Sequence, residues 1–118
     1  MSERVLVDID SHVATVTLNR AAKRNAVDIE MFEAIAGVAE QLANNPSVRA
    51  VVLSGDGEDF CAGIDIAVFG GDGISAGTAD LMRPRTKSGA NFFQNAAMCW
   101  RDLPVPVIAA LHGSVFGA

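Results

Sequence analysis

Two apolar segments of the chain, residues 50–53 and 105–111, each run into a turn that contains glycine. The first, Ala-Val-Val-Leu, is short, continuous and partly β-branched, which is typical of a strand buried on both faces. A helical pattern separates it from an earlier hairpin, and this order predicts parallel strands joined by a helical crossover. Because neighbouring parallel strands end at the same edge of a sheet, we expect both glycine turns at one edge of an α/β fold.

The other elements follow from residue spacing. Residues 5–18 read as two β-rich runs around a polar break, which predicts a hairpin. Asp28 stands at the expected N-cap of a helix of about four turns, which Asn44-Asn45-Pro46 ends. An apolar period of 3.6 residues predicts a second long helix that ends near Asp102. The glycine-rich residues 70–77 predict a flexible loop.

Length and charge limit the possible functions. The 118 residues suit one domain, and an apolar fraction of 50% is enough for a core. A net charge of −5 argues against general attraction to nucleic acid or an anionic membrane. The basic cluster Arg20, Lys23 and Arg24 is either a solvated turn or, if it lies near the site, a local contact for an anion.

Cysteine usage and hydropathy indicate the compartment. The two cysteines, Cys61 and Cys99, do not form a pattern typical of a disulfide-stapled secreted domain. The amino terminus passes directly into a strand-like run without the apolar region of a signal peptide. The longest apolar run is far shorter than the roughly 20 residues needed to span a bilayer. We therefore expect a soluble, cytoplasmic protein.

The first glycine turn, Phe60-Cys61-Ala62-Gly63-Ile64-Asp65, is the best candidate for a site. A backbone N–H at a helix start has no partner within the helix, so Ile64 would present a free donor there. Gly63 permits a backbone conformation that a β-carbon hinders, and Asp65 can cap the following turn. The alternative is that the segment is only a tight connection between a strand and a helix.

One donor is not enough for acyl chemistry. A thioester carbonyl that becomes an enolate needs two backbone donors, and loss of one typically costs about 3 to 4 kcal/mol of transition-state stabilisation. The second turn, His112-Gly113-Ser114-Val115-Phe116-Gly117-Ala118, offers the N–H of Ala118. Two such turns in order favour a site over two unrelated connections.

Other polar residues carry less weight. His12 and His112 are far apart and no ligand cluster accompanies them, so we expect no metal site. His112 is best interpreted as a hydrogen-bonded turn residue, and Cys61 as a buried structural cysteine rather than a thiol of lowered pKa. Glu58 and Asp59 are expected to be solvated. No phosphate-binding glycine loop or nucleophile elbow is present.

Four short motifs follow one another in a specific order. They are Leu18-Asn19-Arg20 with Asn25-Ala26, then Ala50–Gly55, then the Phe60 to Asp65 turn, then Pro-Val-Ile-Ala-Ala from Pro106 leading into Gly113 and Gly117. In this order and spacing the chain resembles the enoyl-CoA hydratase/isomerase family, also called the crotonase superfamily. The resemblance implies a crotonase-like spiral of ββα units, of which residues 1–118 form the amino-terminal part as one acyl-CoA-binding domain.

The family resemblance also assigns roles to residues. It implies that the thioester oxygen lies between the N–H groups of Ile64 and Ala118. It implies that the coenzyme A (CoA) path follows the first turn, along Ala62, Gly63, Asp65 and Ile66. It also implies that Lys23 or Arg24 points toward the CoA phosphates. The CoA thioester is then the substrate, with no cofactor, and the expected assembly is a homotrimer or a dimer of trimers.

Three departures limit what the resemblance carries. Ala21 stands where the family usually has proline, and Ala118 replaces a glycine whose role needs only its N–H. Family members are longer, and the acid/base carboxylates of the hydratases follow the second turn. No catalytic Asp or Glu can therefore be assigned, and the chain on its own is expected to be inactive.

Several functions stay open within this interpretation. The first is an enoyl-CoA hydratase or isomerase of fatty-acid or related acyl-CoA metabolism. Ile64-Asp65, the segment before Leu103-Pro104 and His112-Gly113 look closer to the dienoyl-CoA isomerase branch. A non-catalytic CoA-binding or assembly subunit would keep the fold and lack acid/base groups. A nucleotide-binding α/β domain is disfavoured by the missing phosphate loop.

Overall fold

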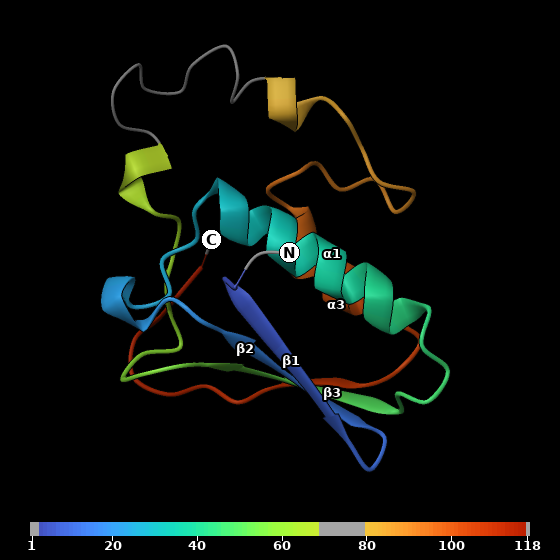
Figure 1. Ribbon diagram of the computed structural model, residues 1–118. Helices are drawn as coiled ribbons and strands as arrows, with labels where there is room; N and C mark the ends of the chain where they lie inside the picture. Colours follow the sequence, from blue (N-terminus) through green and yellow to red (C-terminus); the bar gives the residue numbers. More distant parts are fainter. Residues whose placement is uncertain (1–2, 69–79, 118) are drawn as a thin grey trace.

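The computed structural model describes residues 3–68 and 80–117 (Figure 1). The loop predicted over residues 70–77 and the candidate donor Ala118 lie outside the described residues. The described elements are, in chain order, β1 (Val5–Asp10), β2 (Val13–Leu18), the 3-10 helix η1 (Ala21–Lys23), α1 (Ile29–Ala43), β3 (Ala50–Gly55), β4 (Cys61–Ala62), the 3-10 helix η2 (Ile66–Val68), α3 (Asn95–Arg101), β5 (Val107–Ala109) and β6 (Val115–Phe116).

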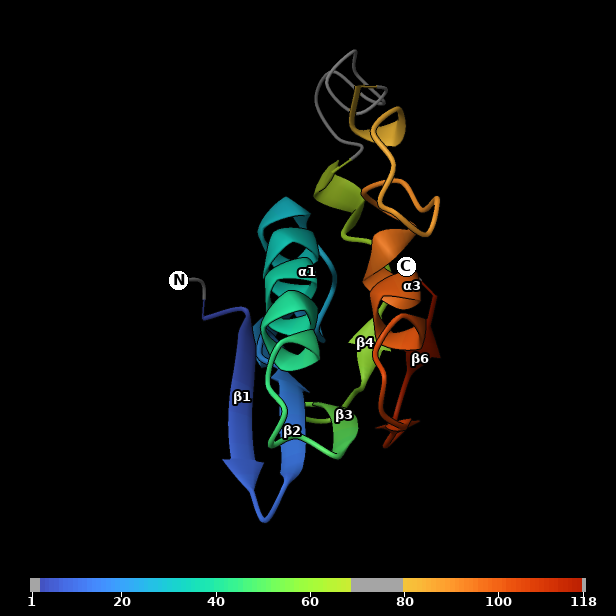
Figure 2. The ribbon, with the colours of Figure 1, turned by 90° about the vertical axis from the view of Figure 1, so that its right-hand side faces the viewer.

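The main sheet has the strand order β1-β2-β3-β5. β1 and β2 form the predicted antiparallel hairpin, with Val5 opposite Leu18. β3 runs parallel to both β2 and β5, so α1 is the crossover between β2 and β3. The predicted hairpin and parallel crossover are confirmed. α1 and α3 lie side by side over one face of the sheet (Figures 1 and 2).

The core lies between α1 and the sheet. Asp28 is the N-cap of α1, since its side chain accepts a hydrogen bond from the Met31 N–H at 2.9 Å. Every fourth or third residue of α1 then turns toward the sheet, as the spacing predicted, and these side chains are buried: Met31, Phe32, Ile35, Ala39 and Leu42. They meet the buried side chains of the strands: Ala14, Val16, Leu18 and Val51.

The helix predicted over residues 92–102 is shorter than expected. α3 covers only Asn95–Arg101, because the preceding turn is closed by side chains. The Asn91 carboxamide oxygen accepts from the Gln94 N–H at 2.9 Å, and the Gln94 side-chain oxygen accepts from the Asn91 N–H at 3.0 Å. This reciprocal pair replaces main-chain helical bonds at the start of the segment.

Aromatic rings join α1 to the segment before α3. The Phe32 ring lies 5.5 Å from the Phe92 ring and 5.2 Å from the Phe93 ring, measured between centroids. The Phe32–Phe93 pair is edge to face, a favoured arrangement of aromatic rings.

The described part of the chain contains no helix with the length and apolarity that a bilayer span requires.

Candidate functional site

The first glycine turn is held between two other segments. On one side, the Ala62 N–H donates to the Arg24 carbonyl oxygen at 2.9 Å. On the other side, the Cys61 N–H donates to the Ser114 carbonyl oxygen at 3.2 Å, and β4 pairs in parallel with β6. Residues 61–65 therefore form the middle layer of a small three-segment arrangement beyond the end of β3.

The two glycine turns lie next to each other, as expected for neighbouring parallel strands. The register of the β4–β6 pair sets Cys61 against Val115 and Ala62 against Phe116. A Cβ atom built on Gly63 would lie 2.9 Å from the Gly117 carbonyl oxygen. Gly63 has φ +90°, a conformation that side chains disfavour, so this position requires glycine both for its backbone angle and for its closeness to Gly117.

The Ile64 N–H, one of the two candidate donors, has no hydrogen-bond partner among residues 3–68 and 80–117. The neighbouring Gly63 carbonyl accepts from the Val27 N–H at 2.8 Å. Since the peptide bond is planar and trans, the Ile64 N–H points in the opposite direction, away from Val27. The turn thus presents one free, oriented donor.

The physical origin of this donor differs from the expectation. Ile64 forms an isolated parallel bridge with Val27, so it is extended rather than the first residue of a helix. The next regular element, η2, is only a three-residue 3-10 helix. A helix dipole therefore adds little here, and the orientation of the donor depends on the turn and its hydrogen bonds.

Asp65 is fixed within the protein. Its Oδ1 accepts from the Ala67 N–H at 3.0 Å, which confirms the expected cap, and its Oδ2 accepts from Arg20 Nη1 at 2.7 Å. The bond from Ala67 and the ion pair with Arg20 lower the pKa of Asp65 below its ordinary value. Ile66, two residues after the donor, is 85% exposed.

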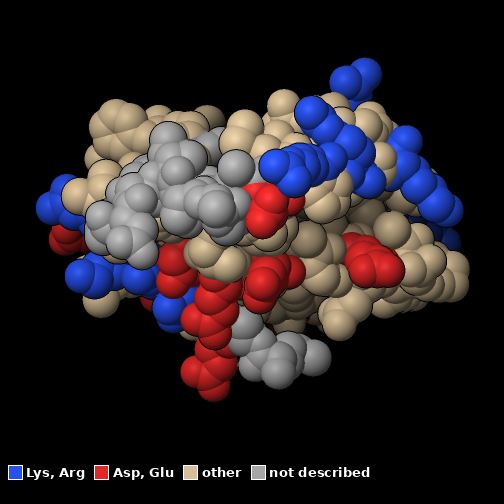
Figure 3. Space-filling model, turned by 90° about the horizontal axis from the view of Figure 1, so that it is seen from above, with Lys and Arg blue, Asp and Glu red and all other residues tan. Residues whose placement is uncertain are grey.

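The three basic residues before α1 divide into two kinds. The Arg20 side chain is only 16% exposed and serves Asp65, so it is structural. Lys23 and Arg24 are exposed, and the Arg24 Nε lies 3.7 Å from the Asp59 carboxylate. Figure 3 shows that basic side chains stand toward two sides of the face seen from above, with acidic side chains between them. That face has no uniform positive field.

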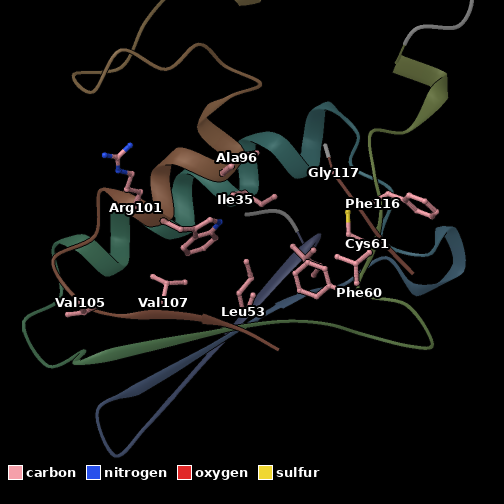
Figure 4. Close-up of a pocket in the computed structure, with 15 residues that line it drawn as sticks. Ile35, Leu53, Phe60, Cys61, Ala96, Arg101, Val105, Val107, Phe116 and Gly117 are labelled. Atoms are coloured by element: carbon pink, nitrogen blue, oxygen red, sulfur yellow. The ribbon is translucent and has the colours of Figure 1, made fainter. Parts of the chain in front are cut away.

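An apolar cavity of about 630 Å³ lies next to the turns, between the sheet and α3. Leu53 and Val107 point from the sheet toward the helices, and Phe60 and Cys61 lie at the end near Gly117, where the Phe116 ring points outward (Figure 4). Such a lining suits an apolar group and offers few polar partners. The cavity thus reaches Cys61 of the first turn and Gly117 of the second.

Cys61 is a buried structural residue, as interpreted. Its thiol donates to the Asn25 carbonyl oxygen at 3.4 Å and its sulfur accepts from the Gly63 N–H at 3.3 Å. Burial raises the pKa of the Cys61 thiol, although the Gly63 N–H opposes the rise. The reactive alternative, a thiol of lowered pKa, does not apply.

The polar residues of the turns after β3 and β5 gave two correct predictions and one wrong one. Glu58 is exposed, as expected. The His112 ring Nε2 donates to the Gly57 carbonyl oxygen at 3.0 Å, which confirms a hydrogen-bonded turn histidine. Asp59 was expected to be solvated, and this is wrong. Its side chain is 12% exposed and its Oδ1 accepts from the Ser114 N–H at 2.8 Å, a bond that lowers the pKa of Asp59. The second turn passes close to residues 58–59, which brings the Ser114 N–H within reach of the Asp59 carboxylate.

Asn25 is the important residue to which sequence reasoning gave no role. It is fully buried, and its side-chain oxygen accepts from the Arg20 N–H at 2.8 Å. Its side-chain nitrogen donates to the carbonyl oxygens of Asp56, Asp59 and Phe60 at 2.9, 2.9 and 3.1 Å. Asn25 thereby ties the turn before α1 to the turn before β4.

In the part of the chain that the structure describes, no group of three His, Cys, Asp or Glu side chains could hold a metal ion.

Comparison with protein families gives one match that covers most of the chain. The family model described as enoyl-CoA hydratase/isomerase matches residues 8–118. A probable enoyl-CoA hydratase of Mycobacterium tuberculosis is 36% identical over 114 residues, which cover 97% of this chain and 41% of that protein. The peroxisomal Δ(3,5)-Δ(2,4)-dienoyl-CoA isomerase of Arabidopsis thaliana is 31% identical, over 98% of this chain and 42% of that protein.

Solved structures agree with the sequence matches. An enoyl-CoA hydratase/carnithine racemase from Magnetospirillum magneticum superimposes with a TM-score of 0.81 at 30% identity, covering 99% of this chain and 42% of that one. An enoyl-CoA hydratase from Mycobacterium smegmatis gives a TM-score of 0.80 at 33% identity, covering 95% and 41%. The chain spans about two fifths of the length of the proteins it matches.

Proposed function

The chain belongs to the enoyl-CoA hydratase/isomerase family, and we propose that it supplies the thioester-binding part of an acyl-CoA enzyme. The α/β fold predicted from the sequence, the amino-terminal part of the crotonase fold, is confirmed by the solved structures of the family. The activity proposed here is that of the whole protein, of which residues 1–118 carry both glycine turns.

One observation supports the proposal most directly. The Ile64 N–H lies beside Gly63 at φ +90°, without a partner among the described residues, and the second glycine turn runs alongside it. A thioester oxygen placed between this donor and the Ala118 N–H would gain two hydrogen bonds as it becomes an enolate. Each donor of this kind contributes about 3 to 4 kcal/mol to transition-state stabilisation.

The substrate contacts follow from the same arrangement. The apolar cavity beside Phe116 suits the acyl group. The CoA moiety would follow the backbone of the first turn, with the exposed side chains of Lys23 and Arg24 toward its phosphates and Ile66 along its path. Because the Asp65 carboxylate is held by Arg20 and the Asp65 N–H donates to the Val27 carbonyl oxygen, we propose that Asp65 shapes the CoA path by holding the turn rather than by bonding to CoA. The CoA thioester is the substrate, and no cofactor is invoked.

The reaction itself is proposed at two levels. Enolate stabilisation is common to hydration and to double-bond migration, and relatives carry names of both kinds. We propose an enoyl-CoA hydratase or isomerase first, a dienoyl-CoA isomerase second, and a non-catalytic CoA-binding subunit third. The acid/base groups are not assigned to any residue of this chain. A cytoplasmic homotrimer or dimer of trimers belongs to the same proposal through family resemblance.

The test uses a thioester that carries an enolate. Isotope-labelled protein is titrated with acetoacetyl-CoA and, in parallel, with free CoA, and backbone amide shifts are followed by NMR. Acetoacetyl-CoA should move the amide signals of Ile64 and Ala118, and free CoA should not. Signals that move only around Lys23 and Arg24 would leave a CoA-binding function without a thioester site, and no binding at all would contradict the proposal.

Turnover by the whole protein then separates the reaction classes, because residues 1–118 on their own are expected to be inactive. Hydration of crotonyl-CoA identifies a hydratase, and isomerisation of a dienoyl-CoA identifies the isomerase branch. Binding of acetoacetyl-CoA without turnover of either substrate supports the non-catalytic subunit.

A further inference from the structure

Val27 holds both peptide units that flank Ile64. Its N–H donates to the Gly63 carbonyl oxygen at 2.8 Å, and its carbonyl oxygen accepts from the Asp65 N–H at 2.9 Å. The Gly63 carbonyl belongs to the same planar peptide unit as the Ile64 N–H. Any movement of residues 26–28 relative to residues 63–65 therefore changes the direction of the free donor.

The guanidinium group of Arg20 joins these two segments. Its Nη1 donates to Asp65 Oδ2 at 2.7 Å and to the Ala26 carbonyl oxygen at 2.9 Å. Its Nη2 lies 3.6 Å from Asp28 Oδ2. The three acceptors are the two neighbours of Val27 and the residue that follows Ile64. Arg20 thus braces the bridge between Val27 and Ile64 from both sides.

Arg20 is itself fixed in place and shielded from water. Its N–H donates to the side-chain oxygen of the fully buried Asn25 at 2.8 Å, and its carbonyl oxygen accepts from the Asn25 N–H at 3.0 Å. The Arg20 and Asp65 side chains are each only 16% exposed. A pair shielded in this way is screened less than a surface ion pair. A planar guanidinium can serve several acceptors at once, whereas the ammonium group of lysine is a single point charge.

We propose that Arg20 is a positioning residue for the thioester site, which acts through Asp65 and Val27 on the direction of the Ile64 N–H. Arg20 does not touch the reacting atoms. This inference rests on the proposed function for its meaning in catalysis, but the brace between the two segments is a property of the free protein and can be measured without substrate.

Two variants and one control test the inference. Arg20→Met removes the guanidinium, and Arg20→Lys keeps only the charge. The control is Arg4→Met, because the Arg4 guanidinium binds the same Asp28 carboxylate at 2.9 Å while Asp65 takes its ion pair from Arg20. Arg4→Met therefore shows how much amide exchange and ligand affinity change when an ion pair with Asp28 is lost and the pair between Arg20 and Asp65 is kept.

The first measurement is amide hydrogen exchange in the free protein. In Arg20→Met, exchange at the Val27 and Asp65 amides should rise about tenfold or more relative to Arg4→Met, because local opening exposes these two bonds. The Ala39 amide, in the interior of α1 and away from the Asp28 cap, reports global opening. If Val27 and Asp65 exchange no faster than in Arg4→Met, or if Ala39 changes in parallel with them, the brace does not exist.

The second measurement compares two ligands. In Arg20→Met, the affinity for acetoacetyl-CoA should fall about tenfold to a hundredfold, because the donor is misdirected rather than lost. Outright loss of an oxyanion donor lowers turnover by roughly 100- to 1,000-fold. Affinity for free CoA should change by less than about twofold, since CoA binding alone does not use the donor. Arg20→Lys should recover little of the loss. An equal loss for both ligands, or full recovery with lysine, would overturn the inference.

The two failures can be told apart. If the unaltered protein binds neither ligand, the proposed function is wrong, and exchange at Val27 and Asp65 alone decides whether Arg20 braces the turn.

Discussion

Gly63 is the residue on which both fold and site depend. On the proposed function, a bulky β-branched side chain here should harm thioester turnover, because it would displace the neighbouring Ile64 N–H. The structure adds a cost to folding, because Gly63 has φ +90° and its Cβ would lie 2.9 Å from Gly117 O. Both effects are expected together at this one position.

Gly63→Ala should lower the free energy of unfolding by about 1 to 3 kcal/mol, because alanine is strained at this backbone angle. It should also abolish the shift of the Ile64 amide with acetoacetyl-CoA. The matched control is Gly37→Ala in α1, where a Cβ meets nothing within 4 Å, and this change should stabilise the helix by up to about 1 kcal/mol. Urea unfolding measures both. An unchanged ligand response in Gly63→Ala would remove this turn from the site.

Asn25 carries a second prediction. Asn25→Ala empties a fully buried position and leaves the carbonyl groups of Asp56, Asp59 and Phe60 without this donor, so stability should fall by about 2 to 4 kcal/mol. Asn44→Ala is the control, since the Asn44 side chain is exposed and donates only to the Glu40 carbonyl oxygen. Its cost should be below about 1 kcal/mol. Similar losses for the two variants, measured by urea unfolding, would show that the turns do not depend on Asn25.

At the scale of elements, three carboxylates connect segments that are distant in sequence. Asp28 joins the start of α1 to Arg4 before β1, Asp59 joins the turn after β3 to Ser114 before β6, and Asp65 joins the first glycine turn to Arg20. Burial tends to raise the pKa of Asp28, but its bonds with Arg4 and the Met31 N–H outweigh this and lower it. The pKa values of Asp59 and Asp65 are lowered as well.

These shifts predict acid sensitivity with a definite sign. Each carboxyl group has a lower pKa in the folded chain than its ordinary value of 3.8, so the unfolded chain binds more protons at acid pH. The stabilisation is complete above the ordinary value and is lost as the pH falls through the lower folded values. Urea unfolding at several pH values below 5 should show this loss. Asp65→Asn should reduce the pH dependence, and an unchanged dependence would mean that the ion pair with Arg20 is not maintained in solution.

The elements with a strong pattern were predictable. The hairpin, α1 and its cap at Asp28, and the parallel position of β3 follow from periodicity and from one capping residue. The start of α3 was not predictable, because the bonds between Asn91 and Gln94 compete with helical bonds and leave the apolar period unchanged. β4 and β6 have two residues each and exist only through their pairing, so no local pattern marks them.

The site was predictable to a similar degree. Gly63 and the convergence of the two turns follow from strand order, and the structure bears them out. The bonds of Arg20, Asn25 and Asp59 were not foreseen, since each joins residues far apart in sequence. A charged residue in a turn reads as solvated until its partner is known. Sequence reasoning therefore found where the two turns meet and missed the side chains that hold them.

At the scale of the molecule, one edge of the sheet is apolar and open. β5 is the last strand in the order, and Ile108 and Leu111 are each 58% exposed, while Phe116 is 64% exposed. An unpaired strand edge beside exposed apolar side chains favours association. The described part of the chain therefore has a surface that tends to pair with further polypeptide.

Ile108→Lys should reduce self-association of this chain, because a charged side chain blunts an edge strand. Sedimentation velocity over a range of concentrations measures the effect. Ile66→Lys is the control, since Ile66 is 85% exposed on η2, away from the strands. If both variants associate as the parent does, the β5 edge is not the contact.

Gly63 and Gly117 come close only when segments that are distant in sequence have met. Residues 24–27 hold the first turn, and the second turn follows β5, which pairs with β3. A partly folded chain that keeps only the hairpin and α1 would show helix by circular dichroism without this close approach. On the proposed function, affinity for acetoacetyl-CoA is then a stricter measure of native structure in this protein than its helix content.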